Sequence, residues 1–275
     1  MIDFERILSN VRERTPLVHN ITNYVTVNDC ANILLACGGS PIMSDDAAEV
    51  EDITSICGGL NINIGTLNQN TIPSMFLAGK RANALSHPVL LDPVGAGASK
   101  LRTETAAKLL EEVKFAVIRG NISEIKALAQ GTNSTKGVDA SEEDEATASN
   151  LGSVVAFARS LSEKTGAIIA ITGATDIIVD KANACTITNG HPMMSKITGT
   201  GCMLSAMTTA FVTANPEQPF EAVCTAVIAM GLCGELAQRR LTELDGNSSY
   251  RNYIIDAVYR LTAEQLVEGA KYEMR

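Results

Sequence analysis

Short apolar runs rich in Val, Ile and Leu alternate with helical patterns along most of the chain, and this alternation constrains the fold more than any other feature. The runs at 88–92, 115–118 and 167–171 are almost continuously apolar, which is typical of strands covered on both faces. The run at 60–64 instead alternates apolar residues with asparagines. Because strands that alternate with helices join a mainly parallel sheet, we predict an α/β fold in a single domain over residues 1–275.

Helices are predicted between and after these runs. We expect residues 44–46 to cap a short helix, and 141–164 to form a longer helix with an acidic start. The buried side of the first is expected to hold Val50, Ile53, Ile56 and Cys57. Residues 176–180 and 184–189 are expected to pair as a hairpin. Further helices are predicted at 103–113, 202–213, 219–240 and 262–273.

The composition narrows the class of partner. The chain has 22 basic and 31 acidic residues, a net charge of −9, which argues against nucleic acid and anionic membranes. Aromatic residues make up 4% and Trp is absent, so few side chains can stack on bases. The uncharged stretch 197–216 contains five Thr, which is unlike a membrane span. We therefore expect a small-molecule ligand.

Cysteine usage points to the inside of the cell. The seven cysteines are an odd number, so they cannot all pair, and no two stand in a Cys-x-x-Cys motif that would favour zinc. The first 16 residues carry too many charges for a signal peptide. We expect a cytoplasmic protein whose cysteines are mostly small core residues.

Candidate site residues follow the predicted strands. Ligands of open parallel sheets bind beyond the carboxyl ends of the strands. The residues at those ends are Gly65-Thr66, Asp92-Pro93-Val94-Gly95-Ala96-Gly97, Arg119-Gly120-Asn121 with Glu124, and Thr172-Gly173. Glycines, a cation, two acids and small hydroxyls suit phosphate and Mg²⁺ better than hydride transfer.

Gly199-Thr200-Gly201-Cys202, directly before a predicted helix, is the strongest single motif. Two close glycines let backbone N–H groups converge, and the helix start adds partial positive charge. Such a nest suits the charge that develops on a transferred phosphoryl group. It lacks the Lys-Ser/Thr pair of a P-loop and the third glycine of a dinucleotide-binding loop, and a tight loop is the alternative interpretation.

Six blocks together resemble the hydroxyethylthiazole kinases of the ribokinase-like superfamily. They are His19-Asn20-Ile21-Thr22-Asn23, Asn63-Ile64-Gly65-Thr66-Leu67, Asp92-Pro93-Val94-Gly95-Ala96-Gly97, Arg119-Gly120-Asn121-x-x-Glu124, Ile171-Thr172-Gly173 and Thr198-Gly199-Thr200-Gly201-Cys202. The resemblance implies a three-layer ribokinase-like fold, a sheet with helices on both faces. It also implies ATP-dependent phosphorylation of 4-methyl-5-(2-hydroxyethyl)thiazole in thiamine salvage. A homotrimer with active sites at subunit boundaries is implied too.

The resemblance also assigns roles. Cys202 matches the catalytic cysteine, where related enzymes usually have an acid. Arg119 and Thr172 match ATP-contacting positions, and Thr200 and Gly201 of the nest are expected beside the phosphates. Asp92 and Glu124 match acids near the phosphates and Mg²⁺. Met43, Gly199 and Asn23 match the thiazole side. Residues 132–147 depart from the family pattern, which leaves the adenine side open.

The residues alone leave several roles open. Cys202 either takes the proton of the substrate hydroxyl or orients that hydroxyl, since a thiol is a poor base at neutral pH. Mg²⁺ takes one or two carboxylates, so one of Asp92 and Glu124 can lie outside its direct contacts. Arg119 would alternatively form a surface salt bridge, and Asn23 would cap a segment starting near Tyr24.

Structural roles are expected for the three histidines, His19, His87 and His191. Met43 is assigned to the ligand by the resemblance alone. Three other functions stay open: an ADP/ATP-dependent NAD(P)H-hydrate dehydratase, a hydroxymethylpyrimidine kinase, and a non-catalytic binder. The first two normally place an acid at the position of Cys202.

Overall fold

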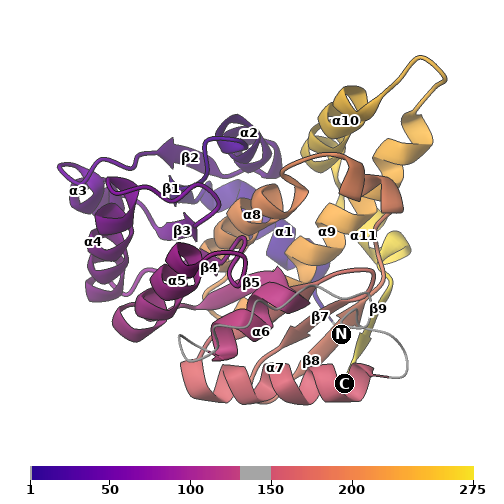
Figure 1. Ribbon diagram of the computed structural model, residues 1–275. Helices are drawn as coiled ribbons and strands as arrows, with labels where there is room; N and C mark the ends of the chain where they lie inside the picture. Colours follow the sequence, from indigo (N-terminus) through magenta and orange to yellow (C-terminus); the bar gives the residue numbers. More distant parts are fainter. Residues whose placement is uncertain (1, 131–149) are drawn as a thin grey trace.

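A single nine-stranded sheet runs through the protein in the order β2-β1-β3-β4-β5-β6-β7-β8-β9 (Figure 1). This computed structural model describes residues 2–130 and 150–275. Strands β2 to β6 pair in parallel, and β7 to β9 continue the sheet antiparallel. The strands are β1 Leu17–Ile21, β2 Ser40–Met43, β3 Gly59–Asn63, β4 Val89–Asp92, β5 Val117–Asn121, β6 Ile168–Thr172, β7 Asp176–Val179, β8 Ala184–Ile187 and β9 Tyr272–Met274.

Helices cover both faces of this sheet, as predicted. One apolar cluster joins α1, α2 and α8 to α11, and the other joins α3 to α7. The helices are α1 Phe4–Arg14, α2 Val27–Cys37, α3 Val50–Ile56, α4 Thr71–Ala84, α5 Lys100–Glu112, α6 Ile122–Gln130, α7 Leu151–Thr165, α8 Thr200–Ala214, α9 Pro219–Arg240, α10 Asn247–Arg260 and α11 Ala263–Gly269. Successive strand residues enter opposite clusters, Ile168 and Ala170 one, Ile169 and Ile171 the other. The fold is therefore three-layered.

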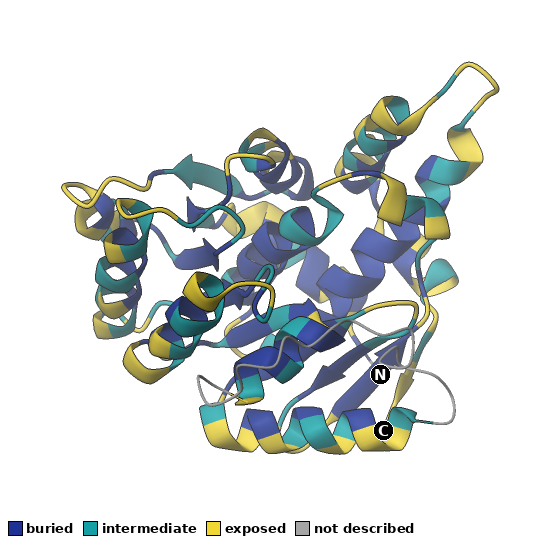
Figure 2. Cartoon of the chain, viewed as in Figure 1, coloured by how far each residue is buried: buried dark blue, intermediate teal, exposed yellow. Residues whose placement is uncertain are grey.

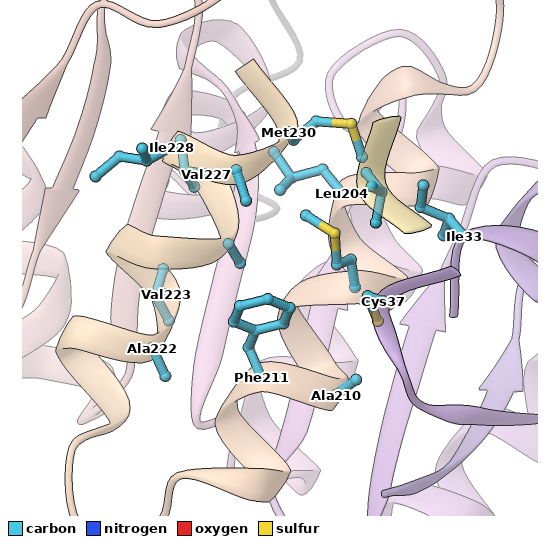
Figure 3. Packing of buried hydrophobic residues seen from close by; sticks show 14 of the residues in the cluster. Ile33, Cys37, Leu204, Ala210, Phe211, Ala222, Val223, Val227, Ile228 and Met230 are labelled. Carbon is cyan, nitrogen blue, oxygen red and sulfur yellow. The ribbon is translucent and has the colours of Figure 1, made fainter. Parts of the chain in front are cut away.

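The central strands are dark with buried residues in Figure 2, and Figure 3 shows how side chains of α2, α8 and α9 pack together. Ile33 and Cys37 of α2, Phe211 of α8 and Val227 of α9 contribute to one cluster. Within the part of the chain that the structure describes, α9 is the one helix with the length and hydropathy of a membrane span. Its most apolar window is 89% buried inside the protein, so its apolar side chains form core.

Most predicted elements are confirmed, including the strands near 88–92, 115–118 and 167–171 and the hairpin of β7 and β8. The alternating run at 60–64 became β3, which is buried on both faces. Asn61 Nδ2 donates to Asn20 Oδ1 at 3.0 Å, so its amide N–H group has a partner inside the protein, whereas its Oδ1 is buried without one. The predicted acidic helix start at 141–149 and the segment 132–147 lie outside the described residues.

Two helix predictions are wrong in detail. α3 begins at Val50, and residues 44–46 form a loop in which Asp46 Oδ1 accepts from Ala48 N. Ile56 was expected to be buried but is 65% exposed, because Thr54 takes the inner position and donates to Val50 O.

The helix predicted at 262–273 is confirmed only in its first part. α11 ends at Gly269, and residues 272–274 form β9, which pairs with β8. The main-chain bond from Thr188 N to Lys271 O continues this pairing at 2.9 Å. A strand partner distant in sequence thus overrides the local helical pattern.

Candidate active site

Predicted site residues gather where parallel strands end beside the start of α8. Asp92 ends β4, Arg119 lies in β5 and Thr172 ends β6. The strand pairing places Asn63 of β3 opposite Asp92, and Asn121 opposite Thr172. Cys202 lies in the first turn of α8, which packs on β3 and β4. Residues far apart in the sequence therefore meet at one edge of the sheet.

Cys202 lies between two asparagine amides. Asn23 Nδ2 donates to its sulfur at 3.2 Å and Asn63 Nδ2 at 3.3 Å. Burial raises the pKa of the Cys202 thiol and the nearby charge of Asp92 adds to the effect, whereas hydrogen bonds from Thr26, Asn23 and Asn63 oppose it. The thiol therefore keeps its proton at neutral pH. Asn63 belongs to the motif Asn63-Ile64-Gly65-Thr66-Leu67, but no role was predicted for it from the sequence.

Asp92 is fully buried, and its two oxygens have different surroundings. Oδ2 accepts from Asn63 Nδ2 at 2.8 Å, Ser205 Oγ at 2.8 Å and Arg119 Nη1 at 3.4 Å. Oδ1 is buried without a hydrogen-bond partner. Burial raises the pKa of Asp92 to about 6, although the charge of Arg119 and these hydrogen bonds lower it. Its unpartnered oxygen can therefore accept a cation or a donor from a ligand.

Arg119 forms an internal ion pair and not a surface salt bridge, since its side chain is only 11% exposed. Nη2 donates to Thr172 Oγ1 at 2.6 Å, which joins the two residues predicted to contact ATP. The guanidinium also lies against Gly201, where an added Cβ would stand 2.7 Å from Nη1. Only glycine allows this close approach of the cation to the first turn of α8.

Gly199 precedes that helix with φ of +91°, in the left-handed region that favours glycine. An added Cβ would meet Thr26 Cγ2 at 2.7 Å. Helix α8 begins at Thr200, so the N–H groups of its first turn have no intrahelical acceptor. The backbone N–H groups at the start of α8 are therefore free to bind an acceptor from outside the helix.

Asn23 forms a turn and also contacts the cysteine. Its Oδ1 accepts from Thr26 N at 3.1 Å and Thr26 Oγ1 at 3.0 Å, while its amide reaches Cys202. Asn23 thus caps the turn at 24–26, which leads into α2 at Val27, as the alternative interpretation predicted. The second acid, Glu124, has both oxygens bound to backbone: Gly95 N donates to Oε1 at 2.8 Å and Asn121 N to Oε2 at 2.9 Å.

A cavity of about 570 Å³ opens beside this cluster. Arg119, Thr172, Thr200 and Gly201 line it, together with residues from β7, α8, α9 and the 3-10 helix η3 Pro192–Lys196. This size is typical of small-molecule sites. Of the residues predicted to hold thiazole, Met43 ends the edge strand β2, and neither it, Asn23 nor Gly199 lines the cavity.

Two residues that line the cavity, Asp176 and His191, were not predicted as site residues from the sequence. Asp176 at the start of β7 accepts from Gly173 N at 2.9 Å, and burial raises its pKa to about 7. His191 lines the cavity too, and its Nδ1 accepts from Met193 N at 3.2 Å. His19 is structural as expected, bonded to Thr54 Oγ1 and to Ser44 O at 2.9 Å each. Asp176 could have been predicted as a site residue, because it follows the Thr172-Gly173 motif by only three residues in the sequence.

The comparisons with known proteins point one way. The model of the hydroxyethylthiazole kinase family matches residues 8–264. This chain belongs to the hydroxyethylthiazole kinase family. A relative named hydroxyethylthiazole kinase in Clostridium acetobutylicum is 66% identical over 97% of both chains, and one in Clostridium tetani is 50% identical over 96% of this chain and 95% of its own.

Solved structures agree with this family. A hydroxyethylthiazole kinase from Pyrococcus horikoshii superposes with a TM-score of 0.87 at 34% identity, over 99% of this chain and 98% of the other. A pyridoxal kinase from Staphylococcus aureus, solved with AMP-PCP and pyridoxal, is 17% identical with a TM-score of 0.59 over 94% of this chain and 97% of its own. That likeness shows the shared ribokinase-like fold. Membership of the kinase family separates the chain from the dehydratases, which share the fold at 14% identity.

Proposed function

We propose that this protein transfers the γ-phosphoryl group of ATP to the hydroxyl of 4-methyl-5-(2-hydroxyethyl)thiazole, in thiamine salvage. The observation that carries the proposal is the group of Cys202, Asp92 and Arg119 at the start of α8, next to a ligand-sized cavity. The relative that is 66% identical along nearly its whole length bears the corresponding name. Within residues 2–130 and 150–275 the strands join in one sheet, which supports one kinase domain over residues 1–275.

The two substrates would lie on opposite sides of Cys202. The nucleotide fits the cavity, with its phosphates near Arg119, Thr172, Thr200 and Gly201. The thiazole alcohol fits the side of Asn23, Gly199 and Met43. Helix α8 then points its free N–H groups and its partial positive charge at the phosphoryl group between them.

Mg²⁺ fits the acids of this site. No group of three or more His, Cys, Asp or Glu within the described residues could form a closed metal cage. Mg²⁺ typically takes one or two carboxylates and completes its shell with water and phosphate oxygens. Asp92 would hold it through the unpartnered Oδ1, and Glu124, already bound to two backbone N–H groups, would support the loop beside it. When bound, the ion would supply charge neutralisation at the phosphates.

Cys202 would orient the attacking hydroxyl. Its thiol keeps its proton at neutral pH, so it acts through a hydrogen bond whose position Asn23 and Asn63 fix. The N–H groups of the first turn of α8 would stabilise charge on the transferred oxygens. Arg119 would bind the departing phosphates, held in place by Asp92 and Thr172.

Cys202→Asp is expected to retain or raise kcat, whereas Cys202→Ala lowers it by about 100-fold. A carboxylate is ionised at neutral pH and can accept the hydroxyl proton, and the two asparagine amides provide donors for it. Steady-state kinetics with saturating ATP measures both. Cys37→Ala, at a buried position of α2, is the control. An Asp variant as inactive as the Ala variant would contradict the assignment.

The substrate is tested by ADP release from ATP and Mg²⁺ with two alcohols. Turnover is expected with the hydroxyethylthiazole, and little above background with a hydroxymethylpyrimidine. No ADP release with the thiazole would refute the proposed reaction, and release with the pyrimidine alone would reassign it to a sister kinase. Nucleotide binding without turnover with either would indicate a binder.

We further propose a homotrimer with active sites at subunit boundaries, in the cytoplasm. Met43, on the proposed thiazole side, ends the edge strand β2, and three apolar side chains before and within α2 are exposed: Tyr24 by 77%, Val25 by 56% and Leu35 by 57%. The seven free cysteines suit a reducing compartment. Sedimentation equilibrium measures the assembly, and the mass of a monomer or dimer would contradict the trimer.

A further inference from the structure

One wall of the cavity is the segment 188–195, between β8 and the end of η3. Arg119, Thr172 and Gly201 lie on the phosphate side, and Asn189, Gly190 and Met194 line this wall. If phosphates occupy the cationic side, the nucleoside of ATP extends toward this wall. The position of the wall therefore sets the room available to the nucleoside.

Glu235 of α9 accepts hydrogen bonds from two residues of this wall. Its Oε1 accepts from Asn189 Nδ2 at 3.1 Å and from Gly190 N at 3.0 Å, and its Oε2 accepts from Lys271 Nζ at 2.7 Å. The side chain is only 9% exposed. Burial opposes its charge, but the hydrogen bonds from Lys271, Gly190 and Asn189 outweigh this and lower the pKa of Glu235. The carboxylate is thus ionised and fully engaged.

The same face of α9 lets the wall approach the helix. Gly231 precedes Gly234 by three residues and Glu235 by four, so it lies one turn of α9 below both of them, and Gly234 directly precedes Glu235. An added Cβ on Gly231 would meet Asn189 O at 2.6 Å, and one on Gly234 would collide with Met194 Sδ. Close contact with two glycines and hydrogen bonds to one carboxylate therefore fix the segment together.

The C-terminal segment completes this attachment. Asn189 Oδ1 accepts from Lys271 N at 2.7 Å, and Asn189 Nδ2 also donates to Gly269 O at 2.8 Å. Lys271 is itself half-exposed, so its ammonium does not depend on Glu235 for solvation. Glu235 is consequently the side chain that links the cavity wall, the long core helix and the segment before β9.

We propose that Glu235 is a positioning residue for the nucleotide, holding the wall 188–195 where it accepts the nucleoside part of a nucleoside triphosphate. Glu235 touches no reacting atom; it acts through Asn189 and Gly190. This inference rests on the proposed function, because it places ATP in the cavity. It predicts that nucleoside recognition and phosphate recognition respond differently to the same substitution.

The test compares two probes, a non-hydrolysable ATP analogue and inorganic tripolyphosphate, by isothermal titration calorimetry on the full chain. Glu235→Ala is expected to weaken binding of the analogue by about 10-fold, which corresponds to about 1.4 kcal/mol. Tripolyphosphate binding should change by less than about 2-fold, and so should the KM of the alcohol. Glu235→Gln keeps an acceptor for Asn189 and Gly190, so it is expected to restore most of the affinity.

Glu221→Ala, in the first turn of the same helix, is the matched control. Unchanged binding of the analogue to Glu235→Ala, or equal weakening of both probes, would overturn the proposal. If Glu235→Ala does not fold, Glu235→Asp keeps the charge but shortens the reach, and the same split between probes is required of it. A wild-type protein that binds no analogue would refute the proposed function instead, while failure to turn over the alcohol would leave this inference intact.

Discussion

Replacing Arg119 with Ala is expected to lower kcat/KM for ATP by about 10³-fold, the range found for arginines that bind transferring phosphates. The substitution removes the cation that lines the cavity and the donor to Thr172 Oγ1. The KM for ATP should rise more than the KM for the thiazole, because the asparagines around Cys202 keep their contacts with each other. Steady-state kinetics with each substrate varied in turn measures this difference.

Arg119→Lys is expected to fall between wild type and Arg119→Ala. A lysine keeps the charge, but its compact ammonium lacks the fork that reaches both Asp92 and Thr172. Arg81→Ala is the control, since Arg81 of α4 donates to Ser55 of α3 and does not line the cavity. A rise in the KM for thiazole larger than that for ATP would remove Arg119 from the nucleotide site.

Asp92→Asn is expected to reduce turnover by at least about 100-fold while it maintains or raises stability at neutral pH. The loss of activity follows from the weaker, neutral ligand at Oδ1 and the lost pairing with Arg119. The effect on stability follows from the pKa of Asp92, which is raised to about 6 because the carboxylate is fully buried. A raised pKa means that folding favours the protonated acid.

The contribution of Asp92 to the stability of the fold is expected to decrease as pH rises. The folded state holds the Asp92 proton more tightly than the unfolded chain, so this group stabilises the fold below about pH 4. That contribution is lost as pH rises through about 6. The stability of Asp92→Asn relative to wild type should therefore be higher at pH 7.5 than at pH 4.5, in urea titrations without metal or nucleotide. A relative stability that falls with rising pH would contradict a raised pKa for the buried carboxylate of Asp92.

The sequence was most informative where local pattern and topology agree. Parallel strands all present their carboxyl ends at one edge, so Asp92, Arg119 and Thr172 could be predicted to meet from their places after three apolar runs. The glycine-rich start of α8 could be predicted for a similar reason, because glycines and a helix start are local features. The family resemblance then supplied roles that spacing alone leaves open.

The N-terminal strands were harder to predict. β1 contains His19 and Asn20, and β2 has four residues that include a proline. Both polar side chains are buried and bonded within the fold, His19 to Ser44 O and Asn20 to Asn61. A pattern that counts apolar residues cannot detect such strands, since their partners are supplied by other elements.

The sequence by itself determined a mainly parallel α/β sheet and the edge at which the candidate site residues gather, because both depend on residue patterns within single elements, and the family resemblance added the three-layer fold. Only the tertiary structure decided that Asn63 joins Cys202 to Asp92, that Asp92 keeps one oxygen unpartnered, and that Glu235 holds the cavity wall. These contacts join residues 29 to 139 positions apart. Burial makes these hydrogen bonds stronger and an unpaired polar group more costly, and it shifts the pKa values of the groups involved. Burial of these residues exists only in the folded chain, so a sequence pattern cannot show it.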